Sequence, residues 1–179
     1  MIIKKGFTLI ELITVMAIIG ILAGSGAWLM FHTIKNSVFI PNQLNMDKLA
    51  DDALDIMIEG DSQAHGLRFS RVITGALANQ VDFINQDSVA ISYLLASGTL
   101  SRKIWPSVTY APLLYYSSIA NISGTPFFTY YSSGVTETVN PTLVRRIRIN
   151  LIAKTGSGTY NDWQGQSEQV SSIAVKKLQ

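Results

Sequence analysis

The longest apolar stretch of the chain begins close to its N-terminus. Residues 12–31 carry no formal charge, and the residues before them, from Lys4 to Glu11, read Lys-Lys-Gly-Phe-Thr-Leu-Ile-Glu. A helix over 12–31 would be about 30 Å long, which matches the hydrocarbon core of a bilayer. Lys4 and Lys5 precede the stretch and no comparable cluster follows it, so the positive-inside rule predicts a cytoplasmic N-terminus and an exported remainder.

A second helical pattern follows over residues 42–59. Apolar residues recur there at three- and four-residue spacing and fall on one face, namely Met46, Leu49, Ala50, Ala53, Ile56 and Met57. Pro41 is expected to kink or interrupt the helix just before this segment, and Gly60 is a suitable C-terminal cap.

Acidic side chains occupy the opposite face of this second helix, namely Asp47, Asp51, Asp52, Asp55 and Glu59. Because they lie opposite the apolar face, we expect that the sheet of the chain's own head does not easily neutralise them. Two interpretations stay open. The face is either solvated, or it meets cations of a neighbouring subunit, with candidates at Arg145, Arg146, Arg148, Lys176 and Lys177.

The remainder of the chain favours β-structure. Runs of β-branched, aromatic or alternating residues predict strands at 80–84, 89–94, 99–104, 127–131, 144–154 and 172–177. The pattern over 67–78 is ambiguous. In 144–154, Ile147 and Ile149 share a face opposite Arg148, which indicates a sheet with one buried face. The prolines after the helix are expected in connections, which is typical of antiparallel sheets.

Glu11 is the one charge inside the apolar run. A carboxylate in hydrocarbon costs about 3 kcal/mol on insertion scales, so it needs a partner. Either Glu11 lies near the interface and reaches water, or it meets a cation at its own depth. Cleavage between Gly6 and Phe7 would create such a cation, the α-amine of Phe7, on a neighbouring chain in an array of parallel helices.

The stretch from Gly6 to Ala23, Gly-Phe-Thr-Leu-Ile-Glu-Leu-Ile-Thr-Val-Met-Ala-Ile-Ile-Gly-Ile-Leu-Ala, resembles the class III leader of type IV pilins and type II secretion pseudopilins. The resemblance implies that a prepilin peptidase cleaves after Gly6 and that Phe7 is then N-methylated. It also implies that Glu11 is the assembly residue, which pairs with a neighbour's N-terminus. Lys4 and Lys5 match the basic residues of the leader.

The same resemblance implies an α+β, pilin-like fold, in which a long N-terminal helix packs its second half on an antiparallel β-sheet. The expected parts are a leader at 1–6, a transmembrane and assembly helix at 7–31, its amphipathic continuation at 32–60, and a β-rich periplasmic or extracellular head at 61–179. The head also resembles J-type minor pseudopilins and related minor pilins. The likeness lies in a hairpin that leads into a Gly-x-Leu-x-Arg strand and in an aromatic strand before a basic, alternating one.

The function implied is that of a minor pilin or pseudopilin, a structural subunit of a type IV pilus or type II secretion pseudopilus. Its implied partners are other pilin or pseudopilin subunits, a prepilin peptidase and the inner-membrane assembly platform. The implied location is the bacterial inner membrane, crossed once, with the head in the periplasm and later extraction into the filament.

The sequence leaves two other interpretations. An ordinary secretory signal cleaved near Ser25 would contain Glu11 in its apolar core, and apolar residues resume after that site. A membrane-tethered enzyme or ligand-binding domain is the second alternative. It would need neither the junction after Gly6 nor Glu11.

The composition of the chain argues against several classes of function. The chain of 179 residues has 14 Lys and Arg against 12 Asp and Glu, so removal of the leader with its two lysines leaves the charges equal. A neutral chain argues against nucleic-acid binding. There is no cysteine and no recognisable catalytic, cofactor or metal motif, so we expect no enzyme, cofactor or metal site. The acids in 156–169 lack calcium-ligand spacing, which favours a flexible loop.

Overall fold

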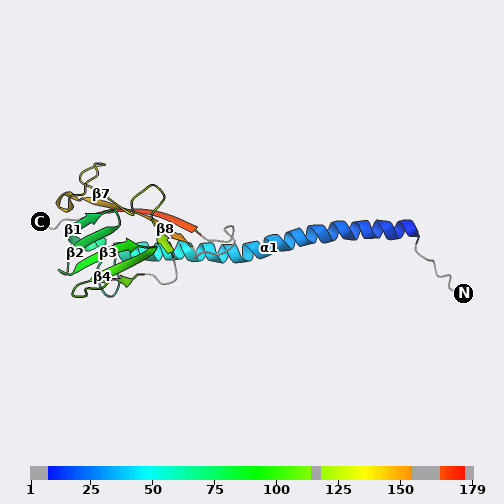
Figure 1. Ribbon diagram of the computed structural model, residues 1–179, viewed down its shortest axis with the longest axis horizontal. Helices are drawn as coiled ribbons and strands as arrows, with labels where there is room; N and C mark the ends of the chain where they lie inside the picture. The colour runs from blue at the N-terminus through cyan, green and yellow to red at the C-terminus, as the bar shows by residue number, and fades with distance from the viewer. Residues whose placement is uncertain (1–7, 114–117, 155–165, 176–179) are drawn as a thin grey trace. The chain divides into compact units, whose positions relative to one another are not determined.

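The computed structural model describes residues 8–113, 118–154 and 166–175 (Figure 1). Over these residues one α-helix, α1 (Leu9–Ile58), is followed by nine strands and two short 3₁₀ helices, η1 (Leu67–Phe69) and η2 (Pro141–Leu143). By its internal contacts the chain divides into two compact units, 1–40 and 41–179. The predicted α+β, pilin-like class is therefore confirmed.

The first part of α1 has no polar face. Every residue from Thr8 to Ile34 is exposed, and leucine, isoleucine, valine and methionine side chains point in all directions. The hydroxyls of Thr14, Ser25 and Thr33 each donate to a backbone carbonyl three or four residues earlier, at 2.8–3.0 Å. Because these hydroxyls are satisfied within the helix, the segment suits apolar surroundings. Among the described residues, α1 is the one helix long and apolar enough to cross a membrane.

Pro41 lies inside α1, and the helix continues through it. Of the two outcomes predicted for this residue, an interruption does not occur, and a kink stays a prediction. A proline removes one backbone hydrogen bond, and residues on both sides can keep the helix when their own bonds are made.

The second part of α1 contributes an apolar stripe to the core of the head. The residues buried on it are Met46, Ala50, Ala53, Leu54, Met57 and Ile58. Ala50 and Ala53 are completely buried, and their short side chains allow the helix backbone to approach its neighbours closely. Of the stripe predicted from residue spacing, Met46, Ala50, Ala53 and Met57 are buried, whereas Leu49 and Ile56 are only partly buried. Leu54 and Ile58 are buried in addition to the predicted residues.

Gly60 ends the helix as predicted. Its φ of +98° lies in the left-handed region, which favours glycine, and its N–H donates to the carbonyl of Asp55 at 3.3 Å. A Cβ at this position would come within 2.2 Å of the Ala64 carbonyl oxygen. The reversal after the helix therefore depends on glycine.

The first sheet is an antiparallel meander packed with the helical stripe in one hydrophobic core. Its strands, in spatial order, are β1 (Ser70–Leu77), β2 (Gln80–Asn85), β3 (Ala90–Ala96), β4 (Thr99–Ile104) and β5 (Ala111–Pro112). Phe83 and Tyr93 are fully buried, and their rings stack with centroids 5.8 Å apart. The Tyr93 hydroxyl donates to the Ile56 carbonyl at 3.1 Å, and burial raises its pKa to about 12.

Two details of this sheet differ from the prediction. Strand β1 lies in the segment whose sequence pattern is ambiguous. The reason for the ambiguity is that the register of β1 with β2 shifts between Ser70 and Val72 and again between Ile73 and Gly75. Each shift breaks the two-residue alternation that would reveal a strand. Pro112 lies in β5 and not in a connection, at the edge of the sheet, where a missing N–H is tolerated.

The second sheet is built around β8 (Arg146–Lys154). β9 (Gln166–Ala174) pairs along one side of it, and β6 (Ser118–Ala120) and β7 (Phe128–Tyr131) pair along the other. β9 begins at Gln166, six residues before the predicted start, because its first half is polar and only its pairing with β8 marks it as a strand. Both faces of β8 are buried from Ile149 to Ala153. The polar side chain of Asn150 is satisfied there, because its Nδ2 donates to the Pro126 carbonyl at 2.8 Å.

Tyr130 joins the two sheets. Its hydroxyl lies 3.0 Å from the carbonyl oxygen of Leu77 and 2.7 Å from that of Gln80, at the turn between β1 and β2. The N–H of Phe128 donates to the Ala78 carbonyl in the same turn, at 2.9 Å. Burial is the main reason that the pKa of Tyr130 lies far above its ordinary value, so the hydroxyl keeps its proton and donates it.

We expect Tyr130→Phe to lower the free energy of unfolding by about 1 kcal/mol, because a buried hydrogen bond is lost while the ring stays. Thermal unfolding of the full-length chain in detergent measures the effect. Tyr131→Phe is the matched control, because the hydroxyl of Tyr131 makes no hydrogen bond in the described part of the chain. Equal losses from the two substitutions would contradict the assigned role of Tyr130.

Candidate functional site

The start of α1 forms a compact polar arrangement in an otherwise apolar segment. The backbone N–H and the hydroxyl of Thr8 both donate to Oε2 of Glu11, at 2.8 and 2.9 Å. The N–H of Glu11 donates back to the Thr8 hydroxyl at 3.3 Å. This reciprocal pattern is a capping box, in which each side chain satisfies a backbone N–H that the first helical turn leaves without a partner.

The capping box gives Glu11 a second role that the sequence reasoning missed. Its signature, Thr-x-x-Glu, is present in the sequence from Thr8 to Glu11 and would have predicted both the helix start and the carboxylate's position. A carboxylate in the first turn also lies at the positive end of the helix dipole. Glu11 is thus exposed to partners while its charge is held by neutral donors.

The other predicted residues of this site are Lys4, Lys5, Gly6 and Phe7, and they lie outside the residues that the structure describes. The geometry of the cleavage junction is therefore not part of the structure. Thr8, the first described residue, directly follows Phe7.

Comparison with known families places this site in a recognised class. Residues 1–27 match the family model described as the prokaryotic N-terminal methylation motif. The chain thus carries the class III prepilin leader of type IV pilins and pseudopilins, which are structural subunits, and the apolar helix that follows supports membrane anchoring. No curated protein and no solved structure matches the chain. The likeness of the head to J-type minor pseudopilins stays a prediction.

The acidic face of α1 is exposed at Asp51, Asp52 and Asp55. Glu59, at its end, lies 2.5 Å from Nη1 of Arg68, so one acid of this face has an ion-pair partner in its own head, outside the sheets. The 3₁₀ turn η1, which follows the Gly60 reversal, brings that arginine back to the helix.

The suggested cations for this face have different surroundings. The guanidinium of Arg146 lies 4.5 Å from the ring centroid of Tyr131, and its Nη2 donates to the Gly134 carbonyl at 3.0 Å. Arg145 and Arg148 are exposed. Lys176 and Lys177 lie outside the described residues. Arg146 is thus already engaged within its own head.

Arg102 on β4 is the most buried charged side chain of the described head, with 8% of its side chain exposed. Its Nη2 donates to Oδ2 of Asp61 at 2.9 Å and to Oε1 of Gln63 at 2.8 Å. Partial burial is the largest single influence on Asp61 and would raise its pKa. The hydrogen bond and charge of Arg102 and the backbone N–H groups of Gln63 and Ala64 together outweigh it, so the pKa lies below its usual value. This ion pair therefore holds the turn after α1 against the sheet at neutral pH.

The two acids of the β2–β3 hairpin in the head, Asp82 and Asp87, have separate partners. Asp87 lies in the turn after β2 and accepts from Nδ1 of His65 at 2.6 Å, whereas Asp82 lies within β2 and contacts Gln80 and Ser92. Within the described ranges no group of three metal-binding side chains occurs. The segment 156–169 considered for calcium lies largely outside them, and its last residues belong to β9.

Proposed function

We propose that this chain is a minor pilin or pseudopilin, a structural subunit of a type IV pilus or type II secretion pseudopilus. The observation that carries the proposal is the match of residues 1–27 to the N-terminal methylation motif, followed by a helix that is apolar on every side to Ile34. Such a helix needs lipid or other apolar helices around it. A membrane supplies the first surroundings before assembly, and a bundle of identical helices supplies the second within a filament.

Processing follows from the leader. A prepilin peptidase removes residues 1–6, and Phe7 becomes the methylated N-terminus. The helix over 7–31 crosses the bacterial inner membrane once, with the lysine side in the cytoplasm. Its continuation over 32–60 carries the head, 61–179, in the periplasm until the subunit is extracted into the filament.

Glu11 serves assembly by exchanging partners. In the isolated chain its carboxylate is held by the neutral donors of Thr8. In a filament the α-amine of a neighbouring Phe7 supplies a cation, and a charge-assisted hydrogen bond is roughly twice as strong as a neutral one. Apolar surroundings strengthen such a pair further, because little water competes for it. The pair would also set the axial register between subunits.

The partners proposed are other pilin or pseudopilin subunits, the prepilin peptidase and the inner-membrane assembly platform. The role is structural and not enzymatic, in keeping with the leader family. Among the described residues the polar clusters of the head support this role, because Arg102 and Tyr130 tie elements of the fold together.

The processing hypothesis predicts the mature N-terminus. We expect mass spectrometry of the membrane-extracted chain, produced with a prepilin peptidase, to find a polypeptide that begins at methylated Phe7. Gly6→Val should leave the leader attached, because the peptidase site loses its glycine. Ala23→Tyr is the control and should be processed normally. A mature chain that begins near Ser25 would show a secretory signal and refute the proposal.

The assembly hypothesis separates two roles of Glu11. We expect Glu11→Ala to leave membrane insertion and the unfolding temperature of the head unchanged while incorporation into filaments is lost. Thr8→Val is the matched variant, because it removes the hydroxyl of the capping box but keeps the carboxylate. Filament fractions sheared from cells and probed for the subunit give the readout. If both variants fail equally, Glu11 acts through the helix start and not through a neighbouring subunit.

A further inference from the structure

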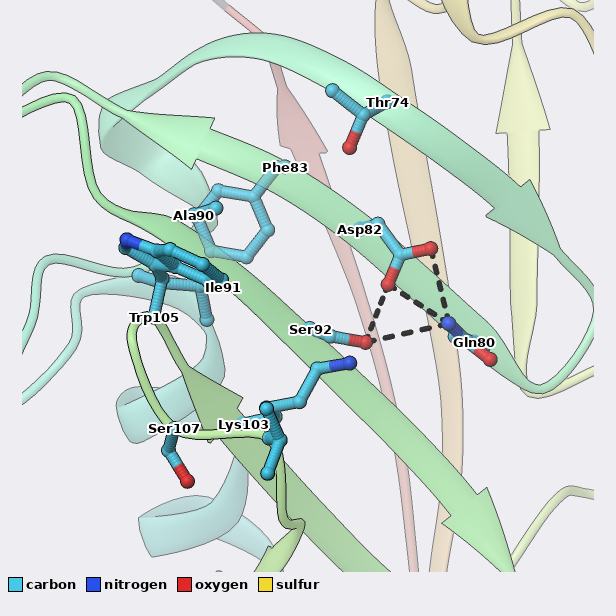
Figure 2. Close-up of a pocket in the computed structure, with 11 residues that line it drawn as sticks. Thr74, Gln80, Asp82, Phe83, Ala90, Ile91, Ser92, Lys103, Trp105 and Ser107 are labelled. Atoms are coloured by element: carbon cyan, nitrogen blue, oxygen red, sulfur yellow. Dashed lines mark hydrogen bonds between the residues drawn. The ribbon is translucent and has the colours of Figure 1, made fainter.

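A cavity of about 390 Å³ lies on the first sheet of the head (Figure 2). Its polar lining comes from neighbouring strands, with Asp82 on β2, Ser92 on β3 and Lys103 on β4. Trp105 lies directly after β4, and its backbone N–H donates to the Ala90 carbonyl at 2.9 Å. The volume falls in the range of small-molecule sites.

Asp82 is held in place by neutral donors. Nε2 of Gln80 lies 2.8 Å from Oδ1 and 3.0 Å from Oδ2, and the hydroxyl of Ser92 donates to Oδ1. The hydroxyls of Ser92 and Tyr110 lie 2.7 Å apart and continue this network. Ser92 is 4% exposed, so the network is anchored by a buried hydroxyl. The orientation of the Asp82 carboxylate is therefore fixed by several hydrogen bonds.

Gly75 on β1 makes room for this carboxylate. A Cβ at Gly75 would come within 2.3 Å of Oδ2 and 3.1 Å of the Cβ of Asp82, so any larger residue would displace the side chain. The bulge in β1 beside Gly75 brings this glycine opposite Asp82. One hydrogen bond is made to Oδ2, so this oxygen keeps accepting capacity, and Asp82 is one of the residues that line the cavity.

Lys103 supplies donors beside this acceptor. Its ammonium lies 4.8 Å from the ring centroid of Tyr110, and in the described part of the chain it has no ion-pair partner. No cation is within ion-pairing distance of Asp82 there either. The lining thus carries one negative and one positive charge that do not neutralise each other by contact.

Trp105 adds a flat apolar surface at the other end of the lining, as Figure 2 shows. Its side chain is 67% exposed, although an indole has a large apolar area that favours burial. An exposed indole next to a fixed array of hydrogen-bonding groups suits a ligand with an apolar face and polar edges.

We propose that this cavity binds a neutral carbohydrate. The balance of Asp82 and Lys103 favours an uncharged ligand, and their unused acceptor and donor capacity matches adjacent hydroxyl groups, which both donate and accept. The C–H face of a sugar ring fits against the indole of Trp105. A purely apolar ligand would desolvate both charges without hydrogen bonds, and a phosphate would meet the carboxylate of Asp82. The site goes beyond the proposed filament function and does not depend on it.

The test is a ligand-observed NMR titration of the full-length chain in a sugar-free detergent. The probes are cellobiose and N,N′-diacetylchitobiose as neutral disaccharides, digalacturonate as a charged one, and triglycine as a peptide. We expect saturable binding of at least one neutral disaccharide, and weaker binding of digalacturonate and triglycine. Trp105→Ala should weaken the binding about tenfold, on the scale of one lost aromatic stacking contact.

Two variants make the result specific. Trp28→Ala removes an exposed tryptophan of α1 and should bind as the unmodified chain does. Gly75→Ala should weaken the binding by displacing Asp82 while Trp105 stays in place, and an unchanged unfolding temperature shows that the head remains folded. The proposal is overturned if neither neutral disaccharide saturates, if Trp105→Ala binds as well as Trp28→Ala, or if digalacturonate or triglycine binds more tightly.

Discussion

The contact between the second part of α1 and the first sheet is the interaction on which the head depends. Ala50, Ala53 and Met57 are completely buried there, in one core with the aromatic residues of β2 and β3. The same helix carries apolar side chains from Leu9 to Ile34 that are exposed in the described part of the chain. One continuous helix thus serves two environments. Its second part completes a folded head, and its first part must find its surroundings in lipid or in other subunits.

Hydrogen bonds and an ion pair at the ends of helices and strands hold the elements around this core together. Gly60 reverses the chain, and the Arg102–Asp61 ion pair then binds the returning segment to β4. Tyr130 links the turn of the first sheet to the second sheet. None of these groups lies near the start of α1 in sequence. The proposed function therefore separates subunit assembly from head stability, so the head could vary without affecting polymerisation.

The sequence was sufficient to predict those helices and strands in which the spacing of apolar residues is regular and uninterrupted. The apolar run, the stripe over 42–59 and the strands β2, β3, β4, β7 and β8 were predicted within a few residues, because burial imposes their spacing. The exceptions have local causes. Register shifts hid β1, polar composition hid the first half of β9, and Pro41 was tolerated inside α1. At the site, Glu11 stands out in the sequence as the one charge in the apolar run, whereas its bonds to Thr8 follow only from the Thr-x-x-Glu spacing at the helix start. The network around Asp82 joins β2, β3 and Tyr110, and patterns within a single strand do not reveal it.

The central claim is that α1 passes from lipid to water between its two parts. Because the sequence has no cysteine, single substitutions can report on this without background. Single cysteines are introduced at Ile18, Leu22, Asp51 and Asp55, and spheroplasts that carry each variant are treated with a membrane-impermeant maleimide. A membrane-embedded first part predicts rapid labelling at Asp51→Cys and Asp55→Cys, and labelling at Ile18→Cys and Leu22→Cys only after detergent is added. Equal labelling at all four positions without detergent would contradict it.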